Sequence, residues 1–60
     1  MQTTATTFAR PEWTRRFAYR AMLMLPALDT VSALMVADSQ FDEASDLQPE
    51  DAAEIYSSQQ

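Results

Sequence analysis

Not one of the 60 residues of this chain is a glycine, and the chain also lacks asparagine. These two residues are the usual occupants of the tight turns that join the strands of a β-hairpin. The composition is instead rich in alanine, methionine, leucine, glutamate, glutamine and arginine, which favour helices. The sequence therefore predicts an all-α fold.

The length of the chain limits how stable such a fold can be by itself. Sixty residues make one domain at most, and a chain of this size buries only about 60% of the surface that its unfolded form exposes. Small domains usually add disulfides, a metal or association. The sequence has no cysteine and no histidine, and its carboxylates lack the spacing of a calcium loop. We therefore expect association, and no metal or other cofactor.

Prolines and acidic residues mark the ends of three helices. Pro11 followed by Glu12 suits a first helical turn, and Pro26 should end that helix. Asp29 is a suitable N-cap for a second helix, and Pro49 suits the start of a third. We predict a helical hairpin of residues 11–25 and 30–44, followed by a short C-terminal helix over residues 49–56.

The two ends of the chain differ from this helical part. Residues 1–9 are rich in threonine, a poor helix former, and we expect them to form a flexible arm that is disordered without a partner. Residues 58–60 read as a polar tail. The predicted folded part is a single small helical unit over residues 10–57.

Apolar residues recur at helical spacing in both longer helices, as expected for helices that bury one side. In the first helix, Trp13, Phe17, Ala21 and Met24 share one face, and Arg15, Tyr19 and Met22 share another. In the second helix, a wide apolar stripe contains Val31, Leu34, Met35, Ala37, Phe41 and Ala44.

Charge is distributed unevenly along the chain, which has a net charge of −5. All four basic residues are arginines between residues 10 and 20, whereas eight of the nine acidic residues lie from Asp29 onward. Such an asymmetry bears on the choice of partner more than on the fold.

Several kinds of enzyme are excluded by the residues that the chain lacks. Without glycine, neither a phosphate-binding loop nor a dinucleotide fingerprint is present, and without histidine the serines and threonines have no usual base to activate them. Pairs of carboxylates need a water-excluding pocket, which two short helices cannot build. We therefore expect a non-catalytic protein that binds a larger protein stoichiometrically, as an accessory subunit, regulator or inhibitor, or that self-associates.

The first helix carries a cluster of aromatic and arginine side chains, the types that dominate protein-binding hot spots. In this interpretation apolar side chains anchor the partner and arginines pair with its carboxylates. The same residue types are also common in a core and on a solvated helix face. The predicted partner-binding residues are Trp13, Arg16, Phe17, Arg20, Leu34, Met35 and Phe41.

A membrane-associated subunit is the first alternative. Residues 21–37 form the most apolar run of the chain, which would lie in or on the bilayer. A span needs about 20 predominantly apolar residues, however, and Asp29 lies inside this run at a depth where a carboxylate is unfavourable. We therefore expect a cytoplasmic protein, with membrane association as the alternative.

An acidic imitation of nucleic acid is the second alternative. A row of carboxylates has the charge and the acceptor oxygens of a phosphate backbone, so it would fit a basic groove on a partner. Direct binding to nucleic acid is not expected, because an acidic chain is repelled by phosphate. The predicted acidic surface contains Asp38, Asp42, Glu43 and Asp46.

Overall fold

The structure, a computed structural model, describes residues 8–60 and consists of three α-helices in this range. Helix α1 spans Arg10–Met24, α2 spans Thr30–Ala44 and α3 spans Pro49–Ser58. The predicted all-α fold, a helical hairpin followed by a short C-terminal helix, is confirmed. Residues 1–7, which belong to the predicted flexible arm, lie outside the described residues.

The folded unit extends slightly beyond the predicted bounds at both ends. Phe8, which we predicted to lie in the arm, is half-buried and packs against the core. At the other end α3 continues to Ser58, past the predicted end at residue 56. The bounds of α2 agree with the prediction.

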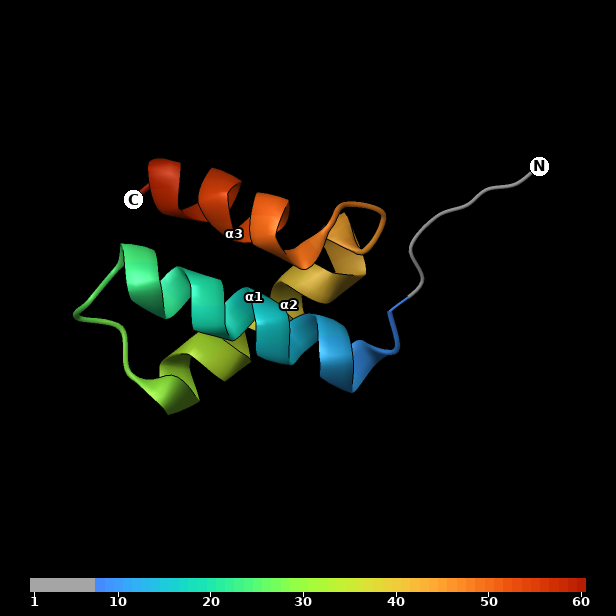
Figure 1. The fold of residues 1–60 in the computed structure, drawn as a ribbon, viewed down its shortest axis with the longest axis horizontal. Coiled ribbons are helices and arrows are strands. Elements are labelled where there is room, and N and C mark those ends of the chain that lie inside the picture. Colours follow the sequence, from blue (N-terminus) through green and yellow to red (C-terminus); the bar gives the residue numbers. More distant parts are fainter. Residues whose placement is uncertain (1–7) are drawn as a thin grey trace.

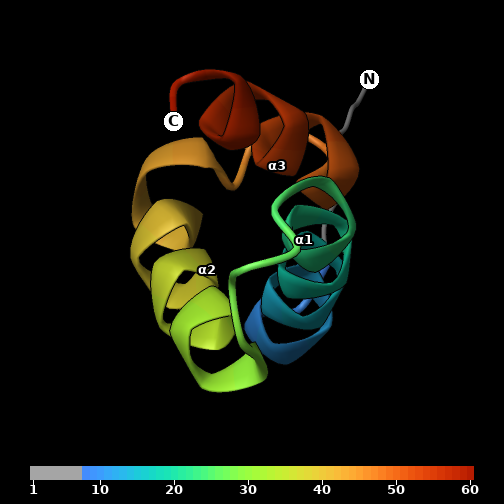
Figure 2. The same ribbon diagram turned by 90° about the vertical axis from the view of Figure 1, so that its left-hand side faces the viewer.

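Helix α1 packs against both of the other helices (Figure 1). The chain reverses direction after α1, so α2 runs antiparallel to it, and reverses again so that α3 runs parallel to α1. Seen along the helices, the three lie at the corners of a triangle (Figure 2). The hairpin of α1 and α2 therefore keeps one long side that α3 does not cover.

The turn between α1 and α2 follows from local chemistry. Helix α1 ends before Pro26, and the peptide N–H of Leu28 donates to the carbonyl oxygen of Leu25 at 2.9 Å. Asp29 then caps α2, because its Oδ1 accepts a hydrogen bond of 2.9 Å from the peptide N–H of Ser32. Hydrogen bonds from the Ser32 hydroxyl and then from its peptide N–H lower the pKa of the Asp29 carboxyl group, because they favour the ionised form.

The apolar run of residues 21–37 is divided by this turn. It includes the last residues of α1, the turn itself and the first half of α2. Within residues 8–60, no helix combines the length and the apolar character that crossing a bilayer requires.

The core is built largely from small side chains. Its large, fully buried members are Trp13, Phe17 and Pro49. Alanine lets helix backbones approach closely but gives each helix little apolar surface to bury. The other buried hydrophobic residues are Ala18, Ala21, Ala33, Ala37, Ala52 and Ala53.

Trp13 connects α1 to α2 and to the loop before α3. Its ring stacks on Phe17 in the same helix, with the ring centroids 5.4 Å apart, and meets the edge of Phe41 in α2, also at 5.4 Å. Its Nε1–H donates a hydrogen bond of 3.0 Å to the carbonyl oxygen of Leu47, in the loop before α3. One side chain thus holds α1, α2 and the α2–α3 loop together.

Candidate interaction surface

The structure places the two predicted aromatic anchors of α1 inside the protein. Trp13 is 1% exposed and Phe17 is fully buried, so neither ring lies on the surface where a partner would meet it. Phe41 is half-buried against this pair. These three residues, predicted to bind a partner, contribute to the core and its edge instead.

The arginines of α1 pair with carboxylates of this same chain. Arg16 contacts Glu50 of α3, with 3.4 Å between Nη1 and Oε2, and Arg20 pairs with Glu54 one turn later. Arg16 and Arg20 are four residues apart, as are Glu50 and Glu54, so both pairs can form because α1 and α3 run parallel to each other. We predicted that Arg16 and Arg20 would meet the carboxylates of a partner; in this structure α3 provides the carboxylates.

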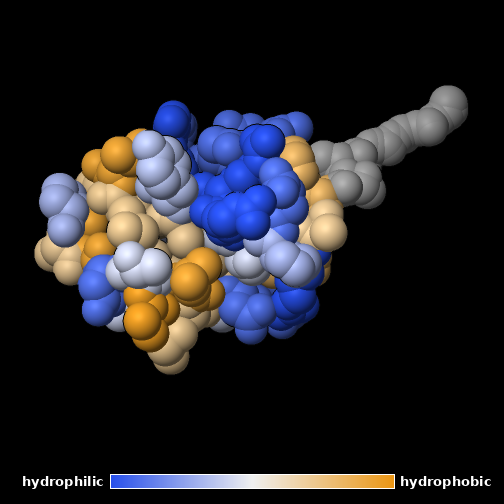
Figure 3. Space-filling view, turned by 60° about the horizontal axis from the view of Figure 1, so that its bottom comes forward, coloured by the Kyte–Doolittle hydropathy of each residue, from blue (hydrophilic) through white to orange (hydrophobic). Residues whose placement is uncertain are grey.

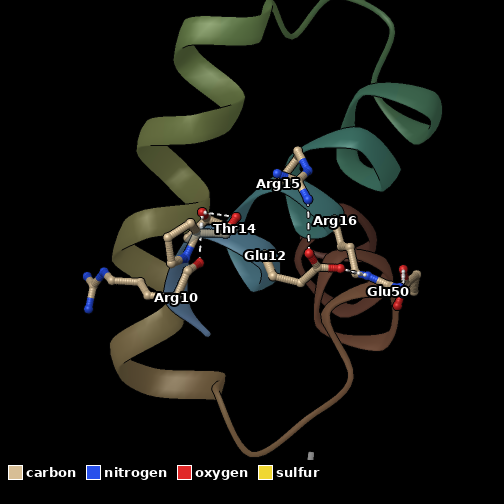
Figure 4. Close-up of polar contacts among 7 residues, drawn as sticks. Arg10, Glu12, Thr14, Arg15, Arg16 and Glu50 are labelled. Carbon is tan, nitrogen blue, oxygen red and sulfur yellow. Dashed lines mark hydrogen bonds and ion pairs between the residues drawn. The ribbon is translucent and has the colours of Figure 1, made fainter. Parts of the chain in front are cut away.

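Glu12 lies between two arginines, as Figure 4 shows. Its Oε1 accepts from Arg15 and its Oε2 from Arg16, both at 2.9 Å. The hydrogen bond from Arg16 and the positive charges of both arginines lower the pKa of the Glu12 carboxyl group. The ion pair within α1 therefore continues, through Arg16, to Glu50 of α3.

Two of the four predicted acidic residues are also paired. The Nε of Arg10 lies 2.8 Å from Oδ1 of Asp38, and its Nη1 lies 3.2 Å from Oδ1 of Asp42. These contacts join the start of α1 to the second half of α2 and raise the pKa of the Arg10 guanidinium. Glu43, near the end of α2, and Asp46, in the loop that follows, have no ion pair within residues 8–60, so the four predicted residues do not form a continuous row of free carboxylates.

The lowered pKa values of Glu12 and Asp29 lead to a prediction about acid. Their ionised forms stabilise the fold above the ordinary carboxyl pKa of about 4, and this stabilisation is lost as the pH falls through the lowered values. We expect a constant thermal midpoint between about pH 7 and pH 5, and a falling midpoint below about pH 4, measured by far-UV circular dichroism.

The variant Asp29→Asn separates the cap from the general effect of acid. Asparagine also accepts the capping hydrogen bond but does not titrate, so the loss on acidification should be smaller than in the wild type. Asp46→Asn is the matched control, because Asp46 has no ion pair among the described residues. A midpoint that stays constant to about pH 2 would contradict the prediction.

Large apolar side chains gather on the outside of the α1–α2 hairpin. Tyr19, Val31 and Met35 are each about two-thirds exposed, and Leu34 is 41% exposed. Figure 3 shows apolar side chains over the half of this side where α1 ends and α2 begins, with hydrophilic side chains over the other half. We call the surface formed by Tyr19, Met22, Val31, Leu34 and Met35 the hairpin face.

A groove of about 530 Å³ runs along the hairpin face between the two helices. Its ionisable lining residues are Arg15 and Tyr19, while the Thr14 hydroxyl already donates to the carbonyl oxygen of Arg10 at 3.0 Å. The groove therefore offers apolar contact and few free polar groups. Its lining consists of Pro11, Thr14, Arg15, Ala18, Tyr19, Met22, Thr30 and Leu34.

Sequence reasoning found part of this face. Leu34 and Met35 were predicted as partner-binding residues, and both lie on it. Tyr19 and Val31 were not predicted, although the sequence holds a signal for each. Tyr19 belongs to the second apolar face that was predicted for the first helix. Val31 belongs to the wide apolar stripe that was predicted for the second helix. The structure divides this stripe into a buried edge and an exposed edge.

The acidic residues show no arrangement for metal chemistry. Within residues 8–60, no three acidic side chains lie close enough together to hold a metal ion.

Comparisons with models of protein families, with curated proteins and with solved structures give no significant match to this chain. Function is therefore inferred from the burial, charges and contacts of the chain itself.

Proposed function

We propose that this chain is a non-catalytic interaction protein that binds a larger protein stoichiometrically through the hairpin face. The observation that carries the proposal is the distribution of side-chain size. Among residues 8–60, six of the eight buried hydrophobic residues that form the core are alanines, while Tyr19, Val31, Leu34 and Met35 lie at the surface. A chain that exposes its larger apolar side chains gains most from covering them.

Burial of the hairpin face by a partner would release a substantial free energy. Full burial of a large aliphatic side chain contributes about 1.5–3 kcal/mol, and the exposed residues of the face are covered by no other part of residues 8–60. A groove between two helices suits an amphipathic helix of the partner. In this role the chain would act as an accessory subunit, regulator or inhibitor.

The alternative of an acidic decoy has less support than the hairpin face. Arg10 already neutralises Asp38 and Asp42, which leaves Glu43 and Asp46 as the free members of the predicted acidic surface. Binding to a basic groove would have to break the contacts of Arg10. Such a decoy would lose affinity steeply with added salt, whereas apolar docking on the hairpin face would change little.

The proposal is tested by affinity capture from native cells with the full chain as bait. We expect the wild type to retain a larger protein, identified by mass spectrometry, and Met35→Glu to lose it. Met35 is 68% exposed, so this substitution leaves the core intact and introduces a charge where the partner should be apolar.

Ile55→Glu is the matched control, because Ile55 is a half-exposed apolar residue of α3, away from the hairpin face. It should retain the partner. The captured protein is then purified and titrated with the chain to obtain the stoichiometry. Capture that survives Met35→Glu, or that both substitutions abolish equally, would refute docking on the hairpin face.

A further inference from the structure

We infer that, without its larger partner, the hairpin face binds a second copy of this chain and forms a symmetric dimer. The inference uses the same face as the proposed function, but it rests on three properties that a self-complementary interface needs. These properties are sufficient apolar area, a ridge beside a groove, and a charge distribution that keeps most free carboxylates away from the contact.

The apolar area of the face matches what a dimer needs. A standard interface buries about 800 Å² on each partner, and in homodimers about 65% of this is apolar, which amounts to roughly 500 Å². The exposed parts of Tyr19, Met22, Val31, Leu34 and Met35 together provide apolar area on the order of 400–500 Å². Most of the apolar part of such an interface is therefore already present.

The shape of the face is suited to meeting its own copy. A two-fold symmetric interface uses the same patch on both subunits, so the patch must contain both a projection and the hollow that accepts it. Val31 and Met35, four residues apart on α2, form an exposed ridge. The groove lies directly beside it, because Thr30 and Leu34 form its α2 wall.

Two copies related by a two-fold axis would place the Val31/Met35 ridge of each in the groove of the other. Ridges that pack into grooves are the general mode of contact between helices. The hairpins of both copies would then form a four-helix contact. The side of the hairpin that α3 leaves open would be covered.

The charges of the chain are compatible with this contact. With a net charge of −5, two copies repel each other unless their free acidic side chains stay apart. Glu43, Asp46 and Asp51, which have no ion pair among residues 8–60, lie at the end of α2, in the following loop and on α3. Asp29, which also has no ion pair in this range, precedes the groove residue Thr30, and its Oδ1 accepts a hydrogen bond from the peptide N–H of Ser32. Arg15 at the groove is held by Glu12, so within residues 8–60 Asp29 is the one free carboxylate beside the proposed contact.

Sedimentation equilibrium of the purified full chain tests the inference. Between about 10 μM and 1 mM, which corresponds to a weak to moderate affinity, the wild-type mass should rise from that of a monomer towards twice that value. Met35→Glu and Val31→Glu should each raise the dissociation constant at least about tenfold, because a carboxylate in an apolar contact loses its hydration.

Ile55→Glu is again the control and should leave the dissociation constant within about twofold of the wild type. Far-UV circular dichroism checks that each variant is helical, and two different substitutions on α2 guard against one that fails to fold. A wild-type monomer up to about 1 mM would overturn the inference, as would equal weakening by Ile55→Glu.

The results also separate the dimer from the proposed function. A monomeric wild type that still captures a larger protein through Met35 would overturn the dimer and leave the proposed function standing. A dimer that Met35→Glu breaks, with no larger protein captured, would support the dimer and refute the proposed function. The two measurements use the same variants, so they can be compared directly.

Discussion

Replacing Trp13 with alanine is expected to unfold much of the protein at room temperature. Removal of a buried tryptophan side chain costs about 3–5 kcal/mol, whereas a domain of 60 residues has a total stability of roughly 3–9 kcal/mol. The side chain is 1% exposed and contacts Phe17, Phe41 and the Leu47 carbonyl. Its loss leaves a cavity where three segments meet, measurable as lost helical signal and a lower urea midpoint.

Two further variants divide this effect into its parts. Trp13→Phe keeps an aromatic ring against Phe17 but removes the Nε1–H donor, so the Leu47 carbonyl oxygen loses its partner and stability should fall by about 1–3 kcal/mol. Tyr19→Ala, at a residue 67% exposed, should change the stability by no more than about 0.5 kcal/mol. Equal losses in Trp13→Ala and Tyr19→Ala would contradict the central role of Trp13.

Enlarging a core alanine is expected to destabilise the protein although it adds apolar surface. Ala37 is fully buried on the side of α2 that faces the core. Three additional carbons there must displace α2 or force a strained side chain, at a cost of about 1–3 kcal/mol. Urea unfolding of Ala37→Leu, followed by circular dichroism, should therefore give a lower midpoint than the wild type.

Ser39→Leu is the matched control for this substitution. Ser39 lies two residues further along α2 and is exposed, and leucine is a better helix former than serine. The stability of this variant should stay within about 0.5 kcal/mol of the wild type or rise. If Ala37→Leu proved more stable than the wild type, the close packing of α1 on α2 inferred from the alanine core would be wrong.

These expectations share one physical basis, which is that the fold depends on a few large residues and on close helix contacts. Two aromatic residues of α1 provide most of the buried ring surface, and alanines allow the helices to approach them. A core of this kind tolerates neither the loss of a ring nor the growth of an alanine. The exposed hairpin face, by contrast, should tolerate substitution in the isolated chain and lose only its binding.

The sequence was sufficient to predict the bounds of the three helices to within two residues. Asp29 accepts the predicted capping hydrogen bond from Ser32, and Pro49 starts α3 as expected. These signals are local: a cap or a proline acts on groups within one helical turn, whatever the rest of the chain does. For this reason the all-α fold and the bounds of α2 agree with the structure.

The role of the arginines was beyond the reach of the sequence. That Arg16 and Arg20 would seek carboxylates follows from their chemistry. Whether the carboxylates belong to a partner or to this chain depends on how α3 lies along α1, and no local pattern specifies that. The structure places Glu50 and Glu54 beside them.

Which face of each helix is buried also depends on tertiary packing. Helical spacing identified Trp13 and Phe17 as members of one face, and Val31, Leu34 and Met35 as members of one stripe. It did not tell which face turns inward, because periodicity relates residues of one helix to each other and not to the neighbouring helices. The structure turns the aromatic face of α1 inward and the large aliphatic edge of α2 outward.

The sequence by itself thus determined the class of fold, the three helices and the absence of glycine-based and histidine-based chemistry. The tertiary structure decided which side chains are core and which are surface. Six alanines and the rings of Trp13 and Phe17 fill the contacts between the helices in residues 8–60, because small side chains let the helix backbones approach closely, while Tyr19, Val31 and Met35 lie outside. The hairpin face is formed by these large apolar residues that remain at the surface.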